Sequence, residues 1–132
     1  MLVDLNVPTN QSATIIRCFG METCVTLAHV ALAQRTGTPI VPAISLLQPD
    51  GRYAMHFLES LVVAPDASWQ NVTQMIWDRL EIHLRSQPEM WLWMYKHWRY
   101  LPASAPASAY PSYAHRSKKY DKLASEVATK KD

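Results

Sequence analysis

The sequence is poor in the residues on which several common sites depend. Its 132 residues include only three glycines and two cysteines. The glycines lie far apart, so the chain has neither a P-loop nor a G-x-G-x-x-G motif, and the G-x-S-x-G motif of serine hydrolases is missing too. Cys18 and Cys24 are too few for a disulfide framework and form no C-x-x-C pair for zinc. We interpret them as two reduced thiols in a core.

Long apolar runs and strong charge are also missing. No window of about 18 apolar residues occurs, so we expect no transmembrane helix. The first residues lack the basic region and apolar core of a signal peptide. The net charge of +2 is too small to indicate a nucleic-acid partner. Residues 1–102 hold 7 Lys/Arg against 8 Asp/Glu, whereas residues 103–132 hold 6 against 3, so the basic excess lies in the C-terminal stretch.

Histidine is present, but in no recognisable catalytic or metal-binding arrangement. No two histidines have the helical i,i+4 spacing with an adjacent glutamate, so we expect no metal site. A histidine followed by a carboxylate after four intervening residues would suit acyl transfer, because the carboxylate holds the imidazole that deprotonates the acceptor hydroxyl. No histidine of the chain is followed by an acidic residue at that spacing. The five histidines are His29, His56, His83, His97 and His115.

Strands and helices are expected to alternate along the first hundred residues. The expected elements are strands at 1–5 and 13–19, a helix at 22–37, strands at 38–48 and 52–63, a helix between Ser68 and Pro88, and a short helix after Pro88. The strand at 38–48 is nearly all apolar, which is typical of a strand buried on both faces. This order predicts an α/β fold, in which a mixed, partly parallel sheet has flanking helices.

Composition changes near residue 102. We predict one α/β domain over residues 1–102 and a disordered tail over residues 103–132, which are first rich in Ala, Ser and Pro and then in Lys.

Residues 87–100, QPEMWLWMYKHWRY, combine tryptophans with basic residues. On a helix, Trp91, Met94, Tyr95 and Trp98 would form one apolar core stripe. Interleaved Trp and Lys/Arg also suit a membrane interface. Stacking on nucleic-acid bases is the third reading, and the near-neutral body disfavours it. The segment alone does not decide between core and interface.

Five short segments, taken in order, resemble one family. They are VDLN at 3–6, CFGMETCVT at 18–26, LAQRTGTPIVP at 32–42, PDGRY at 49–53 and QPEMWLWMYKHWR at 87–99. The series resembles the C-terminal portion of the bacterial lauroyl/myristoyl acyltransferases of lipid A biosynthesis, over about residues 3–99. In that family the corresponding segments resemble D-Q-N, F-F-G-x-x-A-x-T, A-x-R-T-G with PVVP, PDGRY, and P-E-x-W-x-W-x-H-R-R-W-K.

The resemblance implies transfer of a fatty acyl chain from acyl carrier protein to a lipid A precursor. It implies no cofactor, since the donor is the carrier-bound fatty acid. The implied partners are acyl carrier protein, the lipid substrate and the membrane surface, with no nucleic acid. The implied location is peripheral, at the cytoplasmic face of the bacterial inner membrane.

Four residues are candidates for binding substrate, if any contribute to the family's site. Asp4 ends a predicted strand and would face a crevice at the edge of the sheet. Arg99 would hold a phosphate or a carboxylate. Phe19 and Gly20 form the turn of the second segment. Each also has a purely structural reading: a turn cap for Asp4, a surface charge over a Trp face for Arg99 and a positive-φ turn at Gly20.

This sequence also departs from the family. The family's histidine-plus-carboxylate motif lies before the matched region and is not found here, so we assign no catalytic residue. The replaced positions are Leu5 for Gln, Cys18 for Phe, Met21 for Arg, Met90 for Gln, Tyr95 for His and His97 for Arg.

We therefore expect a fragment, one half of a split gene or a decayed copy that is inactive alone. Such a chain needs a missing N-terminal half or self-associates, because it exposes a sheet edge and apolar surface. The alternative is a membrane-surface binding protein that uses the Trp segment and the basic tail.

Overall fold

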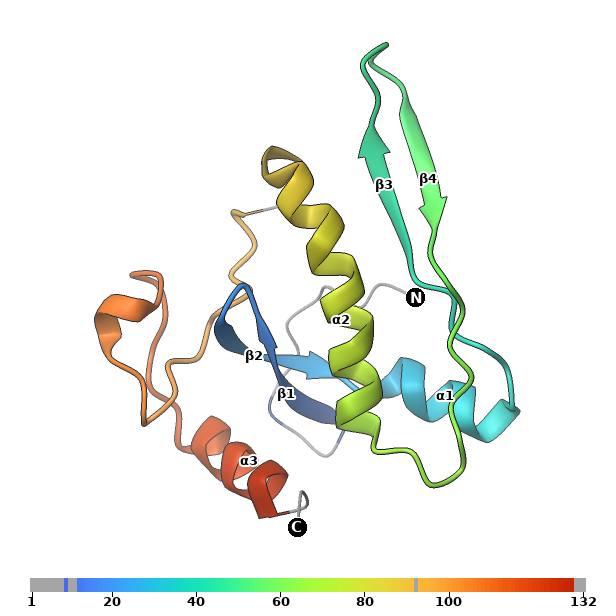
Figure 1. Cartoon of the computed structure of the whole chain (residues 1–132). Coiled ribbons are helices and arrows are strands. Elements are labelled where there is room, and N and C mark those ends of the chain that lie inside the picture. Colours follow the sequence, from blue (N-terminus) through green and yellow to red (C-terminus); the bar gives the residue numbers. More distant parts are fainter. Residues whose placement is uncertain (1–8, 10–11, 92, 130–132) are drawn as a thin grey trace. The chain divides into compact units, whose positions relative to one another are not determined.

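The computed structural model describes residue 9, residues 12–91 and residues 93–129. It contains three α-helices and four strands in two small antiparallel sheets, which confirms the mixed α/β class (Figure 1). The chain divides into two compact units. Unit 1 comprises Met1–His29 with Met94–Asp132, and unit 2 comprises Val30–Trp93. The strand expected at residues 1–5, and with it Asp4, lies outside the described residues.

Unit 1 is built on a hairpin of β1 (Ala13–Cys18) and β2 (Met21–Thr26). The strands pair antiparallel, from Ala13 opposite Thr26 to Cys18 opposite Met21, around a two-residue turn. The prediction of a helix over residues 22–37 is wrong in its first part, because the chain forms β2 there and α1 (Ala28–Thr36) begins later. The β-branched residues Thr23, Val25 and Thr26 favour the strand.

The C-terminal stretch also belongs to unit 1. It contains the 3₁₀ helix η2 (Ala107–Ala109) and the helix α3 (Lys118–Thr129), which packs against β1 (Figure 1). Tyr120 is fully buried there. One hydrophobic cluster joins strands and helix; its members are Ala13, Ile15, Cys24, Tyr120 and Leu123. Composition predicts a disordered tail after residue 102, but the structure differs, since α3 buries an apolar face against the hairpin.

Unit 2 contains a second hairpin and the longest helix of the described chain. The hairpin consists of β3 (Ala43–Leu47) and β4 (Tyr53–Phe57), and α2 spans Trp69–Ser86. As predicted, α2 begins after Ser68, whose hydroxyl accepts a hydrogen bond from the Asn71 amide at 3.4 Å. The turn predicted between the strands is confirmed, and Gly51 adopts φ 81° in it.

Two expectations for unit 2 are wrong. The strand at 38–48 is not buried on both faces, because the residues of β3 alternate between exposed and half-buried. The parallel sheet does not form either. Both described strand pairs are antiparallel, and the parallel pairing found among the described residues is an isolated bridge between Tyr100 and His115. Short hairpin connections pair neighbouring strands antiparallel, and parallel pairing needs a longer crossover.

The Trp segment does not form the expected second helix. Among the described residues of the segment only η1 (Pro88–Met90) is helical, and turns and bends follow it. The apolar stripe of Trp91, Met94, Tyr95 and Trp98 therefore does not exist as one helical face. Met94 is 91% exposed, whereas Trp98 is buried. Of the helices that the structure describes, none is both long enough and apolar enough to cross a membrane.

Candidate functional site

The turn between β1 and β2 uses backbone angles that glycine prefers at both of its positions. Phe19 has φ 51° and Gly20 has φ 80°. Two successive positive φ angles match the right-handed twist of a two-residue hairpin. Phe19 is the only non-glycine residue with positive φ among those described, and this conformation costs about 1–2 kcal/mol. A partner for its ring would offset that strain.

Trp98 is that partner. Its ring lies edge-on to the Phe19 ring, with 6.0 Å between centroids and an interplanar angle of 76°. Trp98 is 3% exposed. An aromatic pair of this geometry contributes about 0.5–1.5 kcal/mol beyond the burial of its area. The second and fifth segments of the family series thus meet in unit 1, at the hairpin turn.

A buried hydrogen bond fixes the same segment to β2. The Thr23 hydroxyl donates to the carbonyl oxygen of His97 at 2.5 Å. The His97 ring lies between those of Tyr95 and Trp98, with centroid distances of 4.8 and 5.8 Å. Tyr95 and His97, two of the three positions where this chain departs from the family's Trp segment, are therefore in ring contact. His97 acts here as a buried packing residue.

Arg99 follows Trp98 but is exposed. Its carbonyl oxygen accepts a hydrogen bond from the His115 amide at 3.0 Å, and the Leu101 amide donates to the His115 carbonyl at 2.9 Å. The backbone of Arg99 is thus tied to the C-terminal stretch, while the residue lies at the surface of unit 1. Of the four predicted site residues, Phe19 contacts Trp98, Gly20 follows Phe19 in the turn and Arg99 follows Trp98 in the chain.

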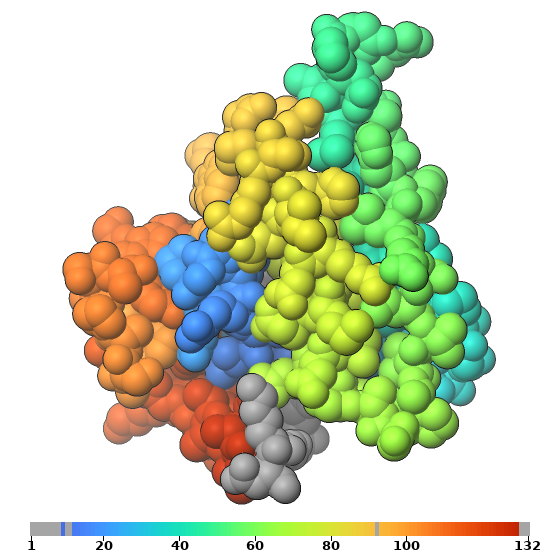
Figure 2. Space-filling model, viewed as in Figure 1, coloured from blue at the N-terminus to red at the C-terminus, as the bar shows by residue number. Residues whose placement is uncertain are grey.

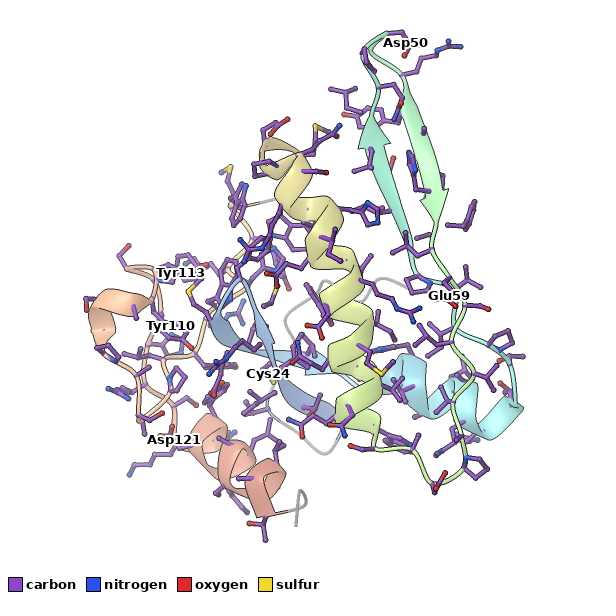
Figure 3. The ribbon with its side chains drawn as sticks, in the orientation of Figure 1. Cys24, Asp50, Glu59, Tyr110, Tyr113 and Asp121 are labelled. Carbon is purple, nitrogen blue, oxygen red and sulfur yellow. The ribbon has the colours of Figure 1, made fainter. Side chains whose placement is uncertain are left out.

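Three residues near the hairpin were missed by the sequence reasoning. The Tyr110 hydroxyl accepts a hydrogen bond from the Glu22 amide at 2.8 Å. The Tyr120 hydroxyl donates to the Glu22 carboxylate at 3.4 Å. Burial raises the pKa of both tyrosines above the ordinary value, so both hydroxyls keep their protons further into the alkaline range than a free tyrosine does. Figure 3 labels Tyr110 and Cys24 in this unit.

One sequence pattern is consistent with this packing of the C-terminal stretch. Tyr120, Leu123 and Val127 recur at three- and four-residue spacing, which is the pattern of an apolar helix face. The prediction of a disordered tail followed the Ala/Ser/Pro-rich composition of the stretch and not this pattern.

The first half of the Trp segment belongs to unit 2. Trp91 lies edge-on to Trp77 of α2, with ring centroids 6.1 Å apart. The indole N–H of Trp93 donates to the Pro88 carbonyl at 2.5 Å. The segment therefore contributes anchors to both units, and the division between them falls after Trp93.

The histidines are spread over separate elements. His29 lies in α1 and is 8% exposed, and neither of its ring nitrogens has a hydrogen-bond partner. Burial lowers its pKa, so the ring is neutral at pH 7. His56 lies in β4, His83 in α2, and His115 beside Tyr100. Among the residues described here, no three or more His, Cys, Asp or Glu side chains gather as a metal site would require.

The groups around the turn between β1 and β2 are suited to binding and packing. Around the β1–β2 turn the structure places aromatic rings and a buried threonine hydroxyl, and the exposed Arg99 follows Trp98 in the chain. The buried Cys24 is not an activated nucleophile, because burial raises its pKa to about 12.

Comparison with known proteins gives one family. A model of that family, described as bacterial lipid A biosynthesis acyltransferase, matches residues 1–100. No curated protein matches the chain. The match covers all five segments of the sequence series and ends at Tyr100, before η2 and α3. The resemblance inferred from these segments is thus confirmed, and the chain belongs to the bacterial lipid A biosynthesis acyltransferase family.

Proposed function

We propose that the chain takes part in acyl transfer to a lipid A precursor as the substrate-side portion of an acyltransferase. The observation that supports this most is the family match over residues 1–100, in which the turn at Phe19 and the Trp segment meet. The donor would be an acyl chain on acyl carrier protein, and the protein would act at the cytoplasmic face of the inner membrane. Asp4, Phe19, Gly20 and Arg99 stay the candidate substrate contacts.

Arg99 is the candidate with chemistry to offer. It is exposed, and its backbone is held by the bridge to His115. An exposed guanidinium can bind a phosphate or a carboxylate through two parallel hydrogen bonds, which a lysine cannot reproduce. A lipid A precursor or the phosphopantetheine of a carrier protein would supply such an anion.

We further propose that the chain alone does not turn over substrate. No histidine is followed by a carboxylate at the required spacing, and His29, His56 and His83 lie on three separate elements, α1, β4 and α2. General-base catalysis typically contributes about 10²–10⁴-fold, so its loss reduces turnover to near background.

Acyl transfer can be measured on the purified full-length chain, with acyl carrier protein as donor carrier and a lipid A precursor as acceptor. We expect no turnover above the no-protein background, but we expect retention of the anionic acceptor. Arg99→Ala should lose that retention, and Arg99→Lys should recover only part of it. The matched control is Arg17→Ala, which removes an exposed arginine from β1 of the same unit.

Turnover by the chain alone would refute its inactivity. Equal acceptor retention by the Arg99 and Arg17 variants would refute the role of Arg99.

A second candidate function is binding to an anionic membrane surface. It is favoured by α3, which exposes Lys118, Lys119 and Lys122 while its other face is buried. Basic residues near an anionic bilayer contribute on the order of 1 kcal/mol each. Co-sedimentation with vesicles containing phosphatidylserine tests it. A variant in which Glu replaces all three lysines should not bind these vesicles. Binding that persists in this variant would exclude α3 as the contact. Failure of the parent chain to bind would exclude it as well.

A further inference from the structure

The β3–β4 hairpin carries an apolar face that nothing in unit 2 covers. The strand register places Leu47 opposite Tyr53, Ser45 opposite Met55 and Ala43 opposite Phe57. Residues opposite each other in an antiparallel pair project from the same face, as do alternate residues of one strand. All six residues are exposed. Phe57 is 74% exposed, Tyr53 65% and Met55 58%.

This exposure is comparable with the largest apolar patch on a typical monomer, and such patches are often functional. Aromatic side chains have about 150–250 Å² each to bury, so the open face presents roughly 400–500 Å² of mostly apolar surface. A two-stranded hairpin is also only marginally stable in water unless another layer packs on it. The described contacts of the hairpin are with α2 through β3, and Figure 2 shows its turn end standing clear of the α2 atoms.

The turn of the hairpin argues against insertion into a bilayer by its tip. Asp50 lies at the tip, as Figure 3 shows, and pairs with Arg52 at 2.6 Å. The Arg52 pairing lowers the pKa of the Asp50 carboxyl, so this ion pair persists at neutral pH. Burying an ion pair in hydrocarbon is costly, whereas at the rim of a protein interface it stays in water.

We propose that this face docks on the same face of a second copy of the chain. Two hairpins related by a two-fold axis would stack their apolar faces about 10 Å apart and leave both charged turns at the rim. The two faces together would bury roughly 800–1,000 Å², close to the area of about 1,000 Å² that a specific interface needs. The dimer is therefore weak and concentration-dependent. This self-association does not depend on acyltransferase function.

Sedimentation velocity of the full chain over a wide concentration range, without lipid, tests the proposal. The mass should rise from that of a monomer towards twice that value as concentration increases. Met55→Glu and Phe57→Glu should keep the chain monomeric over the same range. The matched control is Ile82→Glu, which charges an equally exposed apolar residue, 69% exposed, on α2, and should dimerise as the parent does.

Cross-linking gives a second measurement that does not depend on a charged substitution. Met55→Cys, near the middle of the face, should form a covalent dimer under mild oxidation, whereas Ile82→Cys should not. Cys18 and Cys24 are buried and should not cross-link in the folded chain. Circular dichroism verifies that each variant is folded.

Three results would overturn the proposal. The first is a parent chain that stays monomeric at every concentration. The second is a dimer that Met55→Glu and Phe57→Glu leave intact. The third is a monomer that binds neutral phosphatidylcholine vesicles through Phe57, which would assign the face to lipid.

Discussion

At the residue scale, the turn of Phe19 and Gly20 combines strain with a specific partner. Asparagine and glycine are the usual residues where a two-residue turn needs two positive φ angles. Phenylalanine is a costly choice at the first position. Its ring contact with Trp98 explains the choice, because the contact joins two segments that are 79 positions apart in the chain. The turn is thus a connection within unit 1 as well as a reversal of the chain.

Replacing Gly20 tests the backbone requirement alone. A Cβ at this position would meet no atom within 4 Å, so strain at φ 80° is the whole expected effect. Gly20→Ala should lower the free energy of unfolding by about 1–2 kcal/mol in urea denaturation. Gly20→Asn should cost less, because asparagine tolerates the left-handed region. Equal losses in the two variants would contradict this explanation.

Cys24 predicts how stability changes at alkaline pH. Burial raises its pKa from 9.0 to about 12. Below pH 9 the thiol is protonated in both the folded and the unfolded state, so the contribution to stability is fully present. Between pH 9 and 12 the unfolded chain loses the proton and the folded chain keeps it, so stability falls as pH rises.

The slope of unfolding free energy against pH measures this effect. Cys24→Ala should make the slope shallower between pH 9 and 11 by up to about 1.4 kcal/mol per pH unit. A slope that the substitution does not change would show that Cys24 ionises freely in the folded chain. Tyr120, whose pKa burial also raises, adds to the alkaline loss in both proteins.

At the scale of elements, α3 is a structural part of unit 1. It lies beyond the family match at residues 1–100, yet it inserts Tyr120 and Leu123 among residues of β1 and β2. Tyr100 packs on this cluster as well, and the centroid of its ring lies 5.4 Å from the centroid of the Tyr120 ring. The helix covers one side of a two-stranded hairpin, which would be marginally stable if left bare.

Substitutions at Tyr120 should show how much this cover contributes. Tyr120→Ala should cost about 3–5 kcal/mol in unfolding free energy, because a large side chain is removed from a fully buried site. Tyr120→Phe keeps the ring and loses only the hydroxyl bond to Glu22, so about 1 kcal/mol is expected. The control is Lys122→Ala, on the exposed face of α3. Its free energy of unfolding should stay within about 0.5 kcal/mol of that of the parent. Tyr120→Ala with parental stability would show that α3 does not pack on the hairpin.

At the scale of the whole molecule, the C-terminal stretch and the N-terminal hairpin form one unit across most of the chain length. Tyr110 and Tyr120 contact Glu22 from positions 88 and 98 residues away. The Arg116 guanidinium donates to the carbonyls of Pro102 and Ala105, which holds the intervening loop. A division of the chain at residue 102 would therefore cut through unit 1.

Truncation tests this organisation. Removal of residues 103–132 should abolish cooperative thermal unfolding of unit 1, followed through the near-ultraviolet circular dichroism of the aromatic residues, because the cover of the hairpin is lost. A chain of residues 1–102 that still unfolds cooperatively at the parent temperature would contradict the role of the C-terminal stretch. Membrane-binding tests should accordingly substitute the lysines of α3 and keep the helix.

Local sequence determined the family, the start of α2 after Ser68 and the turn before Arg52. Each of these depends on short-range chemistry: an N-cap hydroxyl, an Asp-Gly turn, or the spacing of residues within one segment. Tertiary structure alone decided that the Trp segment divides between two units and that α3 packs on the β1–β2 hairpin. Those outcomes depend on contacts between distant residues, such as Phe19 with Trp98 and Glu22 with Tyr120. Such contacts override local propensity, because burying an apolar face contributes more than the preference of any one residue.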